Sequence, residues 1–243
     1  MDRADAGGPP VREWARMSFA GFPPAGLSLL ARLPTLDAAA FAAVRPDWQA
    51  YVLDPSRQLV DDLGVCLIEQ ISPGLIADPK VNGSIAPIHR DLRFDPHGPR
   101  YKDHLLFRWW EGTPKKTAPT LLLRLDPSQI GFAAGVLFAS TGTWRTVVGE
   151  RPAGQQLTLL INDIKRASPD VEIAGADLKR VPSPFPADHP AADLLRHRAT
   201  FQIRWAEPLP ADVSTGALTD YCAARLRRLA GLHRWLVTEI GTR

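Results

Sequence analysis

The spacing of apolar residues changes several times along the chain, and each change predicts a different element. Apolar positions recur every three to four residues over 27–71, 153–167 and 218–240, the period of a helix with one buried face. Over 81–138 and 200–205 the runs are short, rich in β-favouring residues and bounded by Gly, Pro and Asp, which predicts strands with antiparallel pairing. Helices, strands and then helices predict an α+β fold: a mostly antiparallel sheet with N-terminal and C-terminal helices packed on it.

Several residues are expected to begin, end or interrupt the helices. Asp37 marks the start of the second helix, and Pro46 should break or kink it because proline lacks a backbone N–H. Asp54 followed by Pro55 is typical of a helix start and predicts the third helix. Gly231 is expected to separate the last two helices.

Residues 171–190 combine a brief strand with a rigid loop. Residues 171–173 favour a strand, whereas residues 182–190 hold four prolines. Proline fits neither a helix interior nor a central strand. We therefore expect an ordered loop or a mobile arm over 182–190.

A charged segment, residues 89–104, separates two apolar runs. It holds ten ionisable side chains and a tyrosine around a Pro/Gly turn. So much charge is costly to bury and needs either partners or a function. The alternative is a solvated hairpin whose arginines pair with its own aspartates, as surface charges commonly do.

Anion recognition is the function that these residue types favour. Guanidinium groups bind phosphate or carboxylate through paired N–H donors, and ammonium groups add a compact positive charge. If Asp91 and Asp95 use up the arginine donors, the cluster is instead purely structural. We expect residues 89–104 to meet a second polar segment, residues 179–189, and to form one anion site. Its predicted ligand-binding residues are Arg90, Arg93, Arg100, Lys102, Lys179, Arg180 and Asp188.

The same two segments also contain candidates for acid–base chemistry. An imidazole oriented by a carboxylate can act as a general base, and positive charge beside a tyrosine favours its phenolate form. Neighbouring residues on a strand point to opposite faces, so such pairs cooperate only in a loop. The candidate catalytic residues are His89 with Asp91, His189 with Asp188, and Tyr101 beside Lys102.

A metal-dependent hydrolase is a further alternative, because imidazole and carboxylate groups suit a hydrolytic metal centre. The spacing of these groups matches neither the HExxH motif nor an EF-hand. We therefore predict no metal site and no cofactor. The residues that could serve as metal ligands are His89, Asp91, His97, Asp103, His104, Asp188 and His189.

Two blocks of the sequence carry a resemblance to a known family. The first is Arg90-Asp91-Leu92-Arg93-Phe94 with Pro99-Arg100-Tyr101-Lys102. The second is Leu178-Lys179-Arg180-Val181-Pro182, Phe185-Pro186-Ala187-Asp188-His189-Pro190 and Leu194-Leu195-Arg196-His197. In this order they resemble the family catalogued as domain of unknown function 2461, and Gly21-Phe22-Pro23-Pro24 and Leu232-His233-Arg234-Trp235-Leu236 are similar to its ends.

The resemblance covers about residues 19–237 and implies no established activity, cofactor or catalytic residue. The chain departs from the family pattern over 35–41, where an Asn-rich run is usual, and at Ile88-His89 before the first block. If the Asn-rich run helps to form a site, that site is altered here.

Length and composition narrow the class of protein. The 243 residues, 45% of them hydrophobic, can build one substantial core. Residues 1–17 lack an apolar stretch and are expected to be a disordered tail, which leaves 18–243 as a single domain. No run reaches the roughly 18 apolar residues of a membrane span, so we expect a cytoplasmic protein without a membrane partner. Cys66 and Cys222 lie far apart in apolar patterns and are expected to be buried thiols.

Charge and motifs together leave two hypotheses of different classes. A net charge of +3, from 29 basic and 26 acidic residues, makes nucleic acid an unlikely partner. The first hypothesis is a protein that binds, and in an enzymatic version transforms, a small anionic molecule. The second is a non-catalytic scaffold or interaction domain with a protein partner, in which the charged motif is a structural network. Cationic side chains that point into one pocket would favour the first hypothesis. Cationic side chains already paired with neighbouring carboxylates would favour the second.

Overall fold

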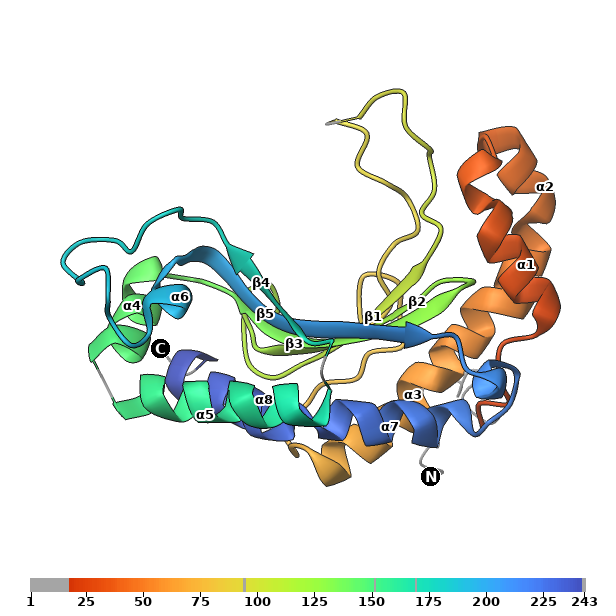
Figure 1. Cartoon of the computed structure of the whole chain (residues 1–243). Helices are drawn as coiled ribbons and strands as arrows, with labels where there is room; N and C mark the ends of the chain where they lie inside the picture. The colour runs from red at the N-terminus through yellow and green to blue at the C-terminus, as the bar shows by residue number, and fades with distance from the viewer. Residues whose placement is uncertain (1–17, 94, 151, 169, 242–243) are drawn as a thin grey trace, which may run out of the picture.

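The computed structural model describes residues 18–93, 95–150, 152–168 and 170–241. The predicted tail, residues 1–17, lies outside the described residues. The fold is a five-stranded antiparallel sheet with helices beneath one face and at its ends (Figure 1). This arrangement confirms the predicted α+β class.

The sheet has the strand order β1-β2-β3-β5-β4, and every neighbouring pair is antiparallel. Side chains alternate between its two faces. In β1, Leu105, Phe107 and Trp109 are at most 2% exposed and point into the core, whereas Leu106 and Arg108 point to the other face. The strands are β1 Leu105–Trp110, β2 Thr120–Leu125, β3 Gln129–Leu137, β4 Glu172–Ala176 and β5 His197–Pro208.

A layer of helices covers the core face of the sheet (Figure 1). Apolar side chains at helical spacing pack there, and indole N–H groups join the layers. The Nε1 atom of Trp109 donates to the carbonyl of Val60 at 3.3 Å, and that of Trp235 donates to the carbonyl of Ala153 at 3.0 Å. No described helix lies over the opposite face. The helices of this layer are α3 Asp54–Gln70, α5 Pro152–Ala167, α7 Leu218–Arg227 and α8 Ala230–Leu236.

The remaining helical segments flank the sheet. α1 Pro24–Arg32 and α2 Ala38–Trp48 stand beside the β1 end, and α4 Thr141–Glu150 and α6 Ala192–Leu195 lie at the other end (Figure 1). Short helical turns complete the chain: η2 Leu33–Thr35, η3 Gln49–Leu53, η4 Ala211–Ser214 and η5 Val237–Gly241. Among the helices that the structure describes, none has both the length and the apolar character needed to cross a membrane.

Asp37 begins α2 as predicted, but Pro46 does not break it. The Asp37 carboxylate accepts a hydrogen bond from the amide of Ala40 at 2.8 Å. Pro46 lies inside α2, which continues through the wider turn η3 into α3. Trp48 and Val52, after the proline, are 8% and 1% exposed. Their burial offsets the hydrogen bond that Pro46 cannot make. The predicted third helix is confirmed as α3, which begins at Asp54 with Pro55 in its first turn. Asp54 itself has helical backbone angles and is not the N-cap.

Three further local expectations need correction. Residues 81–88 form only isolated bridges, such as Ile85 with Phe107, and no continuous strand. Gly231 lies inside α8, not between helices. Helix α4 was not predicted; it is held by Trp144, a fully buried side chain whose Nε1 donates to the carbonyl of Leu194 at 2.9 Å.

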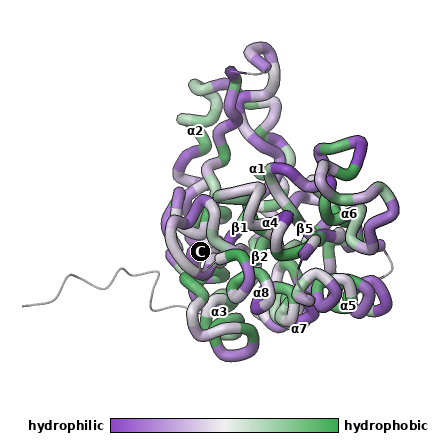
Figure 2. Tube along the Cα trace, turned by 90° about the vertical axis from the view of Figure 1, so that its left-hand side faces the viewer, coloured by the Kyte–Doolittle hydropathy of each residue, from purple (hydrophilic) through white to green (hydrophobic). Residues whose placement is uncertain are grey.

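Two segments without regular structure rise on the open side of the sheet (Figure 1). The first, which we call the ribbon arm, is the hairpin of residues 84–104 that leads into β1. The second, the proline loop, is residues 177–191 between β4 and α6. Hydrophilic positions gather along the ribbon arm at the top of Figure 2, whereas hydrophobic positions concentrate in the elements at its base. Both charged segments of the sequence therefore lie outside the core.

Candidate functional site

The ribbon arm is held by backbone pairing of its two sides. The amide of Arg90 donates to the carbonyl of Arg100 at 3.0 Å, and the amide of Lys102 donates to that of Ile88 at 2.8 Å. At the tip, the amide of Gly98 donates to the carbonyl of Asp95 at 3.2 Å. A Cβ at Gly98 would lie 2.0 Å from a carboxylate oxygen of Asp95, but this is the end of an exposed side chain that can turn away.

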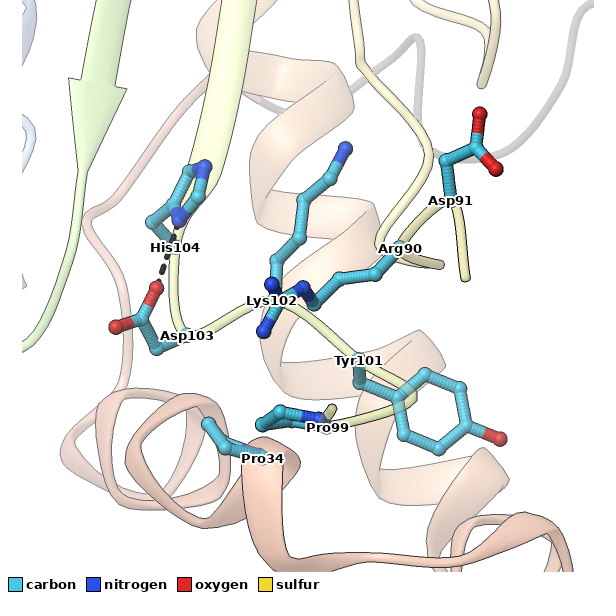
Figure 3. Close-up of a pocket in the computed structure, with 8 residues that line it drawn as sticks. All are labelled: Pro34, Arg90, Asp91, Pro99, Tyr101, Lys102, Asp103 and His104. Carbon is cyan, nitrogen blue, oxygen red and sulfur yellow. Dashed lines mark hydrogen bonds and ion pairs between the residues drawn. The ribbon is translucent and has the colours of Figure 1, made fainter. Parts of the chain in front are cut away.

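One cavity of about 360 Å³ lies at the base of the ribbon arm (Figure 3). Pro34, from η2, lines it on the side of α1. The cavity is mixed in charge, because two cations and two carboxylates line it together. Its polar lining residues are Arg90, Asp91, Tyr101, Lys102, Asp103 and His104.

Asp91 is bonded to Arg93, and the structure shows no hydrogen bond or ion pair between Asp91 and His89. The Arg93 guanidinium donates to both carboxylate oxygens, at 2.9 Å from Nε and 2.6 Å from NH2. These hydrogen bonds lower the pKa of Asp91 to about 2. The ring of His89 instead lies 5.1 Å from that of Tyr101. The structure therefore does not form the predicted His89–Asp91 dyad, because the nearer guanidinium satisfies the carboxylate.

Tyr101 is a packing residue. Its side chain is 3% exposed, and its ring centroid lies 4.6 Å from that of Phe41 in α2. Figure 3 shows the Tyr101 hydroxyl and the Lys102 ammonium pointing in different directions. The pair predicted to form a phenolate is therefore separated, because successive residues of the ribbon face opposite sides.

Lys102 lies between this cavity and the sheet. Its Nζ donates to the carbonyl of Pro87 at 2.7 Å. Partial burial, and then the positive charge of Arg108, lower its pKa. Arg90 has one loose ion pair, 3.6 Å from Asp95, and Arg100 is exposed. The positive charge of Lys102 is therefore close enough to that of Arg108 to be affected by it.

His189 anchors the proline loop and does not contact Asp188. Its Nδ1 accepts from the amide of Ala191 at 3.0 Å, so the hydrogen is on Nε2, which lies 3.2 Å from the carbonyl of Gly149 in α4. Lys179, Arg180 and Asp188 are exposed. The second predicted dyad is therefore absent, because backbone groups occupy both imidazole nitrogens.

The two charged segments do not meet, contrary to our expectation. The cavity at the base of the ribbon arm and the cavity that His189 lines share no residue, and Figure 1 shows the proline loop beside α4 and α6, away from the ribbon arm. The strand order gives the reason. The ribbon arm leads into β1 and the proline loop follows β4, which are opposite edges of the sheet. Four strand spacings put these edges roughly 19 Å apart.

The open face of the sheet carries cationic side chains that were not among the predicted ligand-binding residues. Arg108 of β1, and Lys115 and Lys116 of the following turn, line a cavity of about 360 Å³. None of the described residues lining it is acidic. Alternation with the buried Phe107 and Trp109 was the sequence signal that places Arg108 on this face.

Arg108 and Lys116 lack ion-pair partners among the described residues. The Nε atom of Arg108 is buried and makes no hydrogen bond there. Lys116 is exposed. Lys115 differs, because its Nζ donates to the carbonyl of Gly83 at 3.3 Å and lies 4.7 Å from the centroid of the Trp110 ring. The cavity therefore has an excess of positive charge that the surrounding residues leave uncompensated.

The candidate metal ligands are spread over separate parts of the fold. Within the described ranges, no three His, Cys, Asp or Glu side chains come together as metal ligands would. Asp103 is instead paired with His104, with 2.7 Å between Oδ1 and Nδ1.

Comparisons with known proteins identify a family but no relative of known function. No curated protein and no solved structure matches the chain. A family model does match, over residues 39–235, and its description is Conserved hypothetical protein (DUF2461). This match spans both signature blocks and all five strands, and we conclude that the chain belongs to this family.

Proposed function

We propose that this protein binds a small anionic ligand at the cation-lined cavity on the open face of the sheet. The observation that carries the proposal is the uncompensated charge of Arg108 and Lys116. A buried guanidinium nitrogen without a hydrogen-bond partner is unfavourable. A phosphate or carboxylate group would supply both the partner and the opposite charge.

One signature residue, Lys102, has a supporting role in this proposal. It lies close enough to Arg108 for the two positive charges to act on each other, and it adds to the positive charge beside the cavity. Positive charge near a site raises the local concentration of anionic ligands. Arg93 is already hydrogen-bonded to Asp91 and takes no part in the proposed binding. The proposal is one of binding, since neither carboxylate–imidazole pair is formed.

Binding of inorganic phosphate tests the proposal. Phosphate should raise the melting temperature of the native protein in a concentration-dependent way, because it binds only the folded state. Changing Arg108→Gln together with Lys116→Gln should abolish this shift, whereas Lys179→Gln with Arg180→Gln, a matched loss of two charges, should keep it. Phosphate stabilisation that survives in the first variant and disappears in the second would place the site on the proline loop and contradict the proposal.

A scaffold role is the second candidate, and the Arg93–Asp91 pair favours it. An exposed arginine whose donors are satisfied by its own neighbour fits a structural network better than a ligand clamp. If isothermal titration calorimetry detects no phosphate binding at low ionic strength, this second candidate is preferred.

A further inference from the structure

A second cavity adjoins the cation-lined one on the open face of the sheet. Its volume is about 460 Å³, and both cavities are lined by Leu122 and Gln202. These two residues lie on β2 and β5, so the cavities meet over β3. We call the combined depression the sheet groove.

The middle of the sheet groove is hollow because β3 has small residues there. Gly131, Ala133 and Gly135 alternate with Phe132 and Ala134, which point into the core, and therefore face the groove. Ala133 is 7% exposed. No side chain in this row extends beyond Cβ. The flanking strands carry longer side chains, Leu122 of β2 and Gln202 of β5, which form the walls.

Strand register relates the hollow to the cations. Arg108 pairs with Leu122, Leu122 with Ala133, and Ala133 with Arg204. Directly paired residues project from the same face of an antiparallel sheet. Two strand spacings put the Cα atoms of Arg108 and Ala133 roughly 10 Å apart. A group bound by the Arg108 side chain would thus lie next to the hollow.

The charge of the sheet groove differs between its two cavities. In the larger cavity, Arg204 of β5 is bonded to both oxygens of Glu172, at 2.9 and 2.8 Å. Arg124 of β2, which also lines it, is paired with Asp126. In the other cavity, Arg108 and Lys116 have no such partner in the described part of the chain. A ligand that complements this groove has its negative charge at one end only.

We propose that the sheet groove binds an organic phosphate with a neutral ring. The phosphate lies against Arg108 and Lys116, and the ring lies over Ala133 and Gly135, between Leu122, which pairs with Ala133, and Gln202, which pairs with Gly135. This inference rests on the proposed function and adds the chemical class of the ligand. The flat hollow suits a planar ring, and the Gln202 amide can hydrogen-bond to polar atoms on its edge.

Calorimetry with inorganic phosphate, phenyl phosphate and phenol tests this inference. Phenyl phosphate should bind at least about tenfold tighter than inorganic phosphate, because the ring buries apolar surface in the hollow. Phenol alone should bind more weakly than phenyl phosphate. Equal affinities for phenol and phenyl phosphate would overturn the placement of the anion.

A variant that fills the hollow separates the ring from the phosphate. Ala133→Leu should reduce the affinity for phenyl phosphate to that for inorganic phosphate and leave the latter unchanged. Ala43→Leu, on the exposed surface of α2, is the matched control and should change neither. If Ala133→Leu does not fold, nuclear Overhauser contacts from phenyl protons to the Leu122 and Ala133 methyl groups of the native protein decide the same point.

The outcomes distinguish this inference from the proposed function. If inorganic phosphate binds through Arg108 but the phenyl ring adds no affinity, the ring site is wrong and the anion site remains. If neither compound binds, the proposed function fails and the inference fails with it. Contacts from the phenyl protons only to residues outside the sheet groove would also overturn the inference.

Discussion

The Nε2 atom of His233 lies 3.0 Å from a carboxylate oxygen of Glu111, which joins α8 to the end of β1. His233 is fully buried, and its Nδ1 has no hydrogen-bond partner among the described residues. Burial lowers the pKa of His233, and the contact with Glu111 only partly opposes this. A buried imidazole that resists protonation makes the stability of the fold sensitive to pH.

We predict that the free energy of unfolding falls as the pH is lowered from 7.5 to 5.5. His233 and His197 both have native pKa values below their ordinary 6.5, mainly because of burial. The unfolded chain therefore binds protons in this window that the native state does not bind. The stabilisation is complete above pH 6.5 and is lost toward the native pKa, by at most about 1.4 kcal/mol per pH unit for each histidine.

Urea denaturation at several pH values measures this effect. The slope should be shallower in His233→Gln, which removes one titrating group. Asp91, with a pKa of about 2, does not titrate in this window. A stability that is constant between pH 7.5 and 5.5 would contradict the prediction.

Tyr101 should prove to be a packing residue. Tyr101→Ala should lower the free energy of unfolding by about 3–5 kcal/mol, because it removes a buried aromatic ring beside Phe41. Tyr101→Phe should keep both the fold and phosphate binding, since the ring remains. Loss of phosphate binding in a stably folded Tyr101→Phe protein would restore the phenol to the site.

Arg93→Ala should change the titration of Asp91. Without the guanidinium, the pKa of Asp91 should rise from about 2 toward its ordinary 3.8. Carboxyl ¹³C resonances followed through a pH titration report this change. The melting temperature at pH 7 and phosphate binding should stay as in the wild-type protein, because the pair is exposed. Abolished phosphate binding would instead support the anion site first expected around Arg93.

The two thiols should react slowly in the native state. Both cysteines are free. Burial raises the pKa of Cys222 and of Cys66, and acidic neighbours add to the effect at Cys66. The reactive thiolate is therefore scarce at neutral pH. Ellman's reagent should titrate Cys222 only in urea, so its rapid modification in the native protein would show that the core opens readily.

Much of the fold could be predicted because it depends on local patterns. The spacing in residues 153–167 places Leu157 and Ile161 on the buried face of α5, and both are at most 4% exposed. Alternation in β1 likewise separates Phe107 from Arg108. The free energy of burying apolar surface acts on each such pattern in the same direction wherever the element is placed. Pro46 shows the limit of prediction from local patterns, because the burial of Trp48 and Val52 outweighs the tendency of proline to interrupt a helix.

The candidate site depends on which distant segments lie side by side, and no local sequence pattern predicts this. By itself the sequence determined that residues 89–104 and 179–189 are rich in charged side chains, but strand order placed them at opposite edges of the sheet. The tertiary structure alone brought Arg108, Lys116 and the small residues of β3 onto one face, from separate strands and a turn. Strand order and register minimise the free energy of the whole chain, so they are decided by how all the apolar faces pack together.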